Sequence, residues 1–457
     1  MLSSLKLAAI LLWLLLAIAV PLVLLIIYGM RVFTGLPWVD DWMFLDKLRG
    51  FMLGDLGFDY VLGRHNGHPS VSAHLAFLTS FYIAGLDLGF VRWSSAFIQT
   101  ISALVVAMMF VFQARGNTST KSLLDTLTHP AIVLCIPISV ALFLSLGHWE
   151  TYSLAMAITN FSTLLFVIVS LACVHFWRTG GMPVLLVVAF VGGVGAMLSM
   201  SQGLLVWPSI AAMLVVAPLR KSTIILLVVL IMGFIASVIW HVASTGSPAT
   251  TNIHLSSVVA SILVLLGTSL FGHIGNQPIV SLDMAVGAIV ALLLVCAFAS
   301  YMRSPAETRA KSGFFFGLFV YGIGTVVMIG IGRQSFSLEA YGASRYAGLV
   351  LPVIVGAMGM LSNRDARPGL HREVLAGLLT LSLAGWLVTN FEEARMSVFR
   401  QEILKTLVDK LQHDPDLLNN DERLRAELYL DEYYAAAARR VVPWLRQNEL
   451  SVYREER

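Results

Sequence analysis

Residues 7–28 read LAAILLWLLLAIAVPLVLLIIY and decide the fold, because this long apolar run carries no charged side chain. An α-helix rises about 1.5 Å per residue, so a run of this length crosses the roughly 30 Å hydrocarbon core of a bilayer. No small-x-small cleavage motif stands between the end of this run and Arg31. The run is therefore expected to be a retained signal anchor and the first membrane span.

Further apolar runs follow along the chain. Of its 457 residues, 57% are apolar and 12% are charged, whereas charged residues make up about 25% of a soluble domain. We therefore predict an all-α, polytopic transmembrane bundle of about eleven spans, near residues 7–28, 90–113, 130–147, 153–177, 182–200, 203–219, 222–242, 283–302, 313–331, 345–361 and 373–391. The short apolar segment 256–271 is expected to be re-entrant or interfacial instead of a full crossing.

The distribution of Lys and Arg gives an orientation. The loops after the third, fifth and seventh spans contain neither residue, whereas the alternate loops are basic. The positive-inside rule then predicts a cytoplasmic N-terminus. The net charge of +3 is small and the basic residues are dispersed, so a nucleic-acid partner is excluded while membrane lipids are expected.

Two segments are expected outside the membrane. The first outer loop, residues 30–89, contains two stretches with apolar residues at helical spacing, 36–53 and 68–86, which predict interfacial helices. After Asn390 the chain becomes rich in charge and amphipathic. We therefore divide it into a membrane module, 1–391, and a small helical tail on the outer side, 392–457.

The acidic pair Asp40 and Asp41 directly follows the first span, between Trp38 and Trp42. Tryptophan favours the headgroup zone, so the carboxylates are expected at the membrane surface. Either could act as a general base or hold a divalent cation, and apolar neighbours would raise the pKa of such a base. The alternative is a helix N-cap at Asp41 with Asp40 solvated.

Other polar residues gather in the same outer loops. His65 and His68 stand in a turn-rich stretch and could contact phosphate, ligate a metal together with one of the aspartates, or serve the turn alone. Glu150 could bind a sugar hydroxyl, position the aspartates or be a plain surface carboxylate. Gln202 could donate to a ligand or belong to a tight turn.

A late outer loop adds positive charge. Arg333 ends the ninth predicted span, and Arg345 and Tyr346 begin the tenth. Two guanidinium groups at one mouth would suit a phosphate or diphosphate. Interfacial snorkelling of the side chains is the alternative.

This layout resembles the GT-C superfamily of integral membrane glycosyltransferases, in particular bacterial members of surface polysaccharide assembly. The resemblance is carried by Val39-Asp40-Asp41-Trp42, Arg64-His65-Asn66-Gly67-His68, Trp149-Glu150 and Ser344-Arg345-Tyr346. It implies an inverting transfer of a sugar from a polyprenyl-phosphate donor to a cell-envelope glycan or lipid-linked acceptor, on the outer face of the bacterial inner membrane.

The resemblance also implies roles for residues. Asp40 or Asp41 would be the catalytic base or a metal-organising carboxylate, Arg333 and Arg345 would contact the donor phosphate, and His65 and His68 would complete the pocket. Mg²⁺ or Mn²⁺ is left open as a cofactor.

Two other classes of function compete. A flippase or other transporter of lipid-linked oligosaccharide would place polar residues near the middle of the bilayer, whereas here they concentrate at one mouth. An assembly protein would instead use the outer tail to dock a partner. The distribution of polar residues favours the enzyme.

Overall fold

The structure is a computed structural model of the 457-residue chain. It describes residues 2–115, 126–216, 221–245, 254–272, 279–332, 337–341, 343–363, 369–414 and 416–454. In this part of the chain nearly all regular structure is helical, as the all-α prediction requires.

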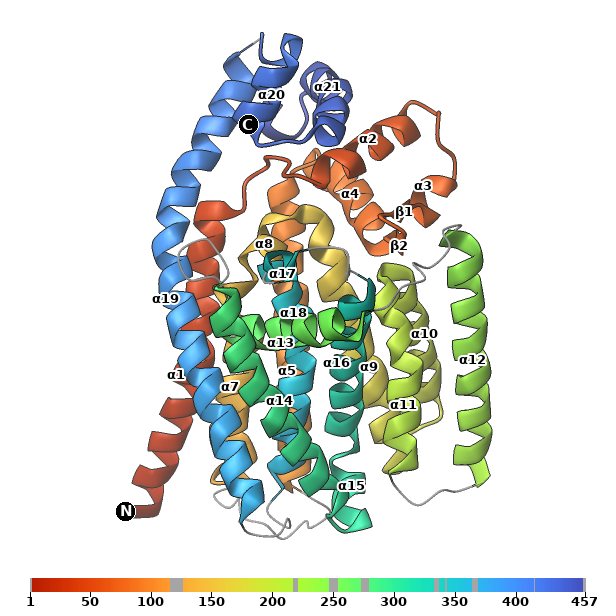
Figure 1. Cartoon of the computed structure of the whole chain (residues 1–457), viewed down its shortest axis with the longest axis vertical. Coiled ribbons are helices and arrows are strands. Elements are labelled where there is room, and N and C mark those ends of the chain that lie inside the picture. Colours follow the sequence, from red (N-terminus) through yellow and green to blue (C-terminus); the bar gives the residue numbers. More distant parts are fainter. Residues whose placement is uncertain are drawn as a thin grey trace.

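Most of the helices form a bundle with roughly aligned axes (Figure 1). Its long elements are α1 Leu2–Val32, α5 Leu88–Arg115, η1 Ala131–Cys135 with α7 Ile136–Phe143, α9 Ile158–Arg178, α10 Val184–Ser199, α11 Val206–Val215, α12 Lys221–Thr245, α14 Val280–Met302, α16 Gly313–Gly332, α18 Ala347–Leu361 and α19 Leu370–His413. Short helices join them: η2 Leu146–His148, α8 Trp149–Ser153, η3 Ala155–Ala157, η4 Ser201–Leu205, α15 Ala306–Lys311, α17 Leu338–Tyr341 and η5 Ser344–Tyr346.

Within the described residues, eight helices are long and apolar enough to cross a membrane. They match the predicted spans 7–28, 90–113, 130–147, 153–177, 283–302, 313–331, 345–361 and 373–391. The helices at the other three predicted spans, α10, η4 with α11, and the central part of α12, are apolar but shorter by the same measure. The chain is therefore a helical membrane protein, and its total of about eleven spans stays a prediction.

The segment expected to be re-entrant or interfacial forms α13, Leu255–Phe271. It lies across the neighbouring helices instead of along them (Figure 1). Its position agrees with a segment too short to be counted as a crossing.

Glycine lets α16 and α18 pack with their backbones close together. A Cβ atom on Gly322 would lie 2.3 Å from the backbone nitrogen of Val353, and one on Gly356 would lie 2.5 Å from that of Phe319. Small residues favour such close helix packing in membranes, where the apolar solvent gives little other driving force. This contact holds α18, whose N-terminal end leads to Arg345, against the rest of the bundle.

At one end of the bundle, the first long loop and the C-terminal tail form one unit, which we call the head (residues 33–87, 414 and 416–454; Figure 1). Its elements are α2 Asp41–Met52, α3 Asp59–Leu62, β1 Arg64–His65, β2 His68–Pro69, α4 Val71–Ala84, η6 Leu417–Asn419, α20 Asp421–Leu428, α21 Glu432–Gln447 and η7 Ser451–Tyr453. The two helices predicted in loop 30–89 are confirmed as α2 and α4. α19 runs without a break through the predicted boundary at 391/392 and reaches the head.

Candidate functional site

The site begins at the turn that leads into α2. Val39 has φ of 44°, an uncommon and costly value for a β-branched residue. Such a conformation persists only where surrounding contacts impose it. Directly after this residue, Asp40 and Asp41 point into two different environments.

Asp41 is fully buried and bonded on both oxygens. Its Oδ2 lies 3.0 Å from Nη2 of Arg92, and the backbone nitrogens of Trp38 and Ala155 also donate to Oδ2. The backbone nitrogen of Met156 donates to Oδ1 at 2.9 Å. Asp41 therefore makes no N-cap bond of the predicted kind, and its carboxylate has no exposed surface that a substrate could reach.

Arg92 extends this junction to three chain segments. Its guanidinium donates to the backbone oxygens of Thr34, Leu36 and Ser153, in addition to Asp41. Both charges are almost completely excluded from solvent. The pair therefore fastens the start of the first long loop to α5 and α8, which is a structural role.

Asp40 faces the head instead. Its Oδ1 accepts a hydrogen bond from the Tyr434 hydroxyl at 2.6 Å and lies 3.0 Å from Nε2 of His65. The Asp40 side chain keeps 17% of its surface exposed. It therefore combines fixed orientation with access from outside, which Asp41 lacks.

Three groups control the charge of Asp40. Burial by itself would raise the pKa of Asp40, but hydrogen bonds from His65 and Tyr434 and the charges of His65 and Arg345 outweigh it. The pKa of Asp40 is therefore lowered below the ordinary value of an aspartate. For Asp40 the expected raised pKa is wrong, because polar groups from distant segments reach this carboxylate. For Asp41 the expected direction is confirmed, since burial raises the pKa of that carboxyl.

His65 and His68 are held by a two-residue β-hairpin. Asn66 and Gly67 both have positive φ, at 48° and 76°, the combination that a type I′ hairpin turn requires. β1 and β2 pair antiparallel, with His65 opposite His68. His65 reaches Asp40, while Nδ1 of His68 lies 2.7 Å from the Ser201 hydroxyl on η4.

Glu150 and Arg345 meet at the same end of the bundle. Glu150 Oε2 accepts hydrogen bonds from the backbone nitrogen of Arg345 at 3.2 Å and from the Ser344 hydroxyl at 3.4 Å. Its Oε1 lies 3.9 Å from Nη1 of Arg345, and the Arg345 side chain is 38% exposed. Within the described chain, the buried Nε of Arg345 has no hydrogen-bond partner. The guanidinium is thus held in place with donor capacity left over.

The remaining predicted residues fall around this centre. Gln202 is buried beside Ser201 on η4, and its Oε1 has no hydrogen-bond partner among the residues that the structure covers. Tyr346 is buried, with its ring 5.4 Å from the Arg345 guanidinium carbon. Arg333 lies outside the described residues, so the predicted pair of arginines is represented by Arg345.

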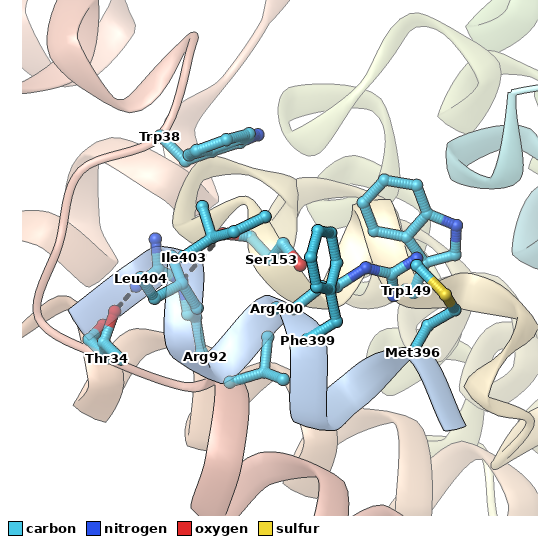
Figure 2. Close-up of a pocket in the computed structure, with 11 residues that line it drawn as sticks. Thr34, Trp38, Arg92, Trp149, Ser153, Met396, Phe399, Arg400, Ile403 and Leu404 are labelled. Carbon is cyan, nitrogen blue, oxygen red and sulfur yellow. Dashed lines mark hydrogen bonds between the residues drawn. The ribbon is translucent and has the colours of Figure 1, made fainter. Parts of the chain in front are cut away.

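An apolar cavity of about 220 Å³ adjoins the site. It is lined by Val32, Thr34, Trp38, Arg92, Trp149, Ser153, Met396, Phe399, Arg400, Ile403 and Leu404 (Figure 2). Trp38 and Trp149 are close in sequence to Asp40 and Glu150, so the cavity lies next to the polar residues. Arg400 stacks over the Trp149 ring at 3.7 Å and pairs with the buried Glu393.

The structure brings only some of the predicted metal ligands together. Of the predicted ligands, Asp40 and His65 are adjacent, whereas Asp41 is bonded to Arg92 and His68 to Ser201. Over the described ranges, no group of three or more His, Cys, Asp or Glu side chains is arranged to hold a metal ion. The predicted residues therefore supply two neighbouring ligands at most.

Sequence reasoning missed two partners of the aspartates. Arg92 did carry a signal, because a charged residue at the start of a long apolar helix requires a partner. Tyr434 carried none, since nothing in a tail of amphipathic helices marks one tyrosine as the partner of a residue 394 positions away.

Protein-family models, curated proteins and solved structures give no significant match to this chain. The likeness to GT-C enzymes accordingly remains an expectation carried by short motifs. Function is inferred from the site itself.

Proposed function

We propose that the protein is an inverting membrane glycosyltransferase that uses a polyprenyl-phosphate-linked sugar as donor. The observation that carries this proposal is one cluster at one end of the bundle. In it an ionised, partly exposed carboxylate, Asp40, lies within the electrostatic reach of Arg345 and beside an apolar cavity. A lipid-linked anionic sugar has matching parts: an apolar chain, a phosphate and a polar ring.

Asp40 would accept the proton of the acceptor hydroxyl. His65 and Tyr434 both bond to Oδ1, which leaves Oδ2 to receive the acceptor, with no bond to it from the residues described. Because the pKa of Asp40 is lowered, the carboxylate is a weak base. Proton transfer is therefore expected late, after the hydroxyl oxygen has begun to bond to the anomeric carbon and has become acidic.

Arg345 would stabilise the departing phosphate. As the glycosidic bond breaks, negative charge grows on the phosphate oxygen, and a fixed guanidinium interacts more strongly with this transition state than with the ground state. Glu150 holds the Arg345 backbone in place. A phosphate is a good leaving group once its charge is stabilised, so this site needs no separate general acid.

The apolar cavity would accept the first part of the lipid chain. Its walls come mainly from α19, from α8 and from the segment between α1 and α2. A chain bound there would leave its phosphate near Trp38 and Trp149, which both line the cavity (Figure 2). Aromatic side chains of this kind are typical of the zone between hydrocarbon and headgroups. The same cluster provides the headgroup contacts at Arg345.

The proposal is tested with purified protein in proteoliposomes and a panel of radiolabelled polyprenyl-phosphate sugars. Asp40→Asn should lower the rate of sugar transfer by about a hundredfold or more, because the base is removed. The matched control is Asp55→Asn, an exposed aspartate of the same loop, which should keep full activity. Full activity of Asp40→Asn would refute the base assignment.

The same vesicles separate the enzyme from the transporter. An enzyme forms a new glycosidic bond and releases polyprenyl phosphate. Movement of the labelled donor between leaflets, with neither product formed for any donor in the panel, would instead support a flippase.

A further inference from the structure

We propose that the C-terminal tail completes the site, with Tyr434 acting as a positioning residue for Asp40. This inference rests on the proposed function, in which Asp40 is the base. Tyr434 comes from α21, almost at the end of the chain, and its hydroxyl donates to Oδ1 of Asp40 at 2.6 Å. None of the site residues predicted from the sequence belongs to the tail.

Polar contacts fasten the tail to the first long loop at separate points. Arg440 on α21 forms a two-pronged pair with Asp46 on α2, with distances of 2.7 and 3.0 Å to Oδ2. Farther along the chain, the Ser451 hydroxyl donates to the backbone oxygen of Gly35 at 2.7 Å, and Arg454 donates to that of Ala84 at 2.6 Å. These bonds hold α21 at its middle and beyond its C-terminal end.

An apolar core joins the same two segments. Buried side chains of α2, α4, α20, α21 and the end of α19 form one cluster, which includes Trp42, Phe44, Leu45, Leu48, Phe77, Leu407, Leu411, Leu424, Ala438, Val441 and Leu445. Trp444 also stacks with Phe81 at a centroid distance of 6.2 Å. Apolar burial on this scale makes the tail a fixed part of the head and not a loosely attached appendage.

α19 connects this tail to the cavity. Five residues of α19 between Met396 and Leu404 line the cavity, and the same unbroken helix continues to His413, where it meets the head. One element therefore carries both the apolar wall and, through the tail, the hydrogen bond to Asp40. The cavity wall and the residue that bonds Asp40 are therefore joined through one continuous helix.

The chemistry of the contact suits a positioning role. The charged and titratable groups that act on Asp40 and Tyr434 are His65, Arg345 and Asp431. Burial and the bond to Asp40 raise the pKa of Tyr434, so its hydroxyl stays protonated and donates. The bond stabilises the ionised carboxylate and orients it, which leaves Oδ2 directed at the acceptor.

The test compares Tyr434→Phe with Tyr433→Phe, an exposed neighbour in the same helix. Without its donor, Asp40 should be protonated more easily. The acid limb of kcat/KM for sugar transfer should then move to higher pH, with a loss of about tenfold below it. Tyr433→Phe should leave the profile unchanged. An unshifted acid limb in Tyr434→Phe would overturn the inference.

A second measurement needs no substrate. Carbodiimides modify protonated carboxyl groups, so mass spectrometry of the labelled peptide over a pH series reports the protonation of Asp40 directly. Labelling should extend to higher pH in Tyr434→Phe and not in Tyr433→Phe. If labelling shifts while no donor is ever used, the positioning contact stands and the proposed function fails; if labelling does not shift, the positioning contact fails.

Should Tyr434→Phe prove unstable, 3-fluorotyrosine at position 434 keeps the ring and makes the hydroxyl a stronger donor. Labelling of Asp40 should then begin only at lower pH than in the unmodified protein. An unchanged pH series would again overturn the inference.

Discussion

The surroundings of Asp40 and of Asp41 form two contrasting regions that begin one residue apart. Asp41 is enclosed by α5 and η3 and bonded on both oxygens, whereas Asp40 keeps exposed surface and contacts polar side chains from the head. Neighbouring acids are therefore not equivalent candidates. A buried carboxylate whose oxygens are all hydrogen-bonded has a structural role, whereas a partly exposed carboxylate can act on a substrate.

The largest expected difference between the two regions is in stability. Asp41→Asn should lower the free energy of unfolding by about 3–5 kcal/mol, because it leaves the buried Arg92 charge without its counterion. Thermal unfolding in detergent and SDS titration would measure the loss.

Asp40→Asn is the matched control for that experiment. It removes a partly exposed carboxylate of the same type, so the fold should largely persist while activity is lost. Equal destabilisation by the two variants would contradict the assignment of a structural role to Asp41 and a functional role to Asp40.

A smaller effect is expected at Arg345. Arg345→Ala should raise the apparent KM for the lipid donor by about tenfold, the size expected for losing a hydrogen bond to a charged group. Arg345→Lys keeps the charge without the two-pronged geometry and should recover part of the loss. Donor titrations with each variant give the measurement, and an unchanged KM in Arg345→Ala would remove this residue from the phosphate site.

The pH dependence should distinguish the Asp40 region further. Because the pKa of Asp40 is lowered in the folded protein, its ionised form contributes stability above the unfolded pKa of about 3.9. That contribution is lost as the pH falls through the lower folded value. When Tm is measured from neutral to acidic pH, its decrease should be smaller in Asp40→Asn than in the unmodified protein. Identical curves would contradict this linkage.

The smallest effect concerns a third carboxylate, Asp46, whose Arg440 partner is half exposed. An exposed ion pair contributes roughly 0–1 kcal/mol, so Arg440→Gln should barely change Tm, in contrast to the buried Asp41–Arg92 pair. Arg425→Gln, an exposed arginine on α20, serves as control. A loss comparable to that of Asp41→Asn would show that the tail depends on charge more than on its apolar cluster.

Much of the helical fold could be predicted from the sequence, because apolar periodicity is a local property. The helices α2 and α4, and the failure of 256–271 to form an aligned span, follow from short-range patterns. The hairpin at His65 was recognised as a turn but not as paired strands, although Asn66-Gly67 is a strong signal for it. The roles of Asp40 and Asp41 could not be separated, since both stand between the same tryptophans.

By itself, the sequence determined that this chain is a helical membrane protein and that its polar residues gather in a few loops. The reason is that the length of an apolar run and the positions of charged residues can be read from consecutive residues. Only the tertiary structure decided which polar residues meet. Arg92 neutralises Asp41, while His65 and Tyr434 direct Asp40, and these contacts join segments 25 to 394 residues apart. Such contacts depend on how helices pack, which no local pattern encodes.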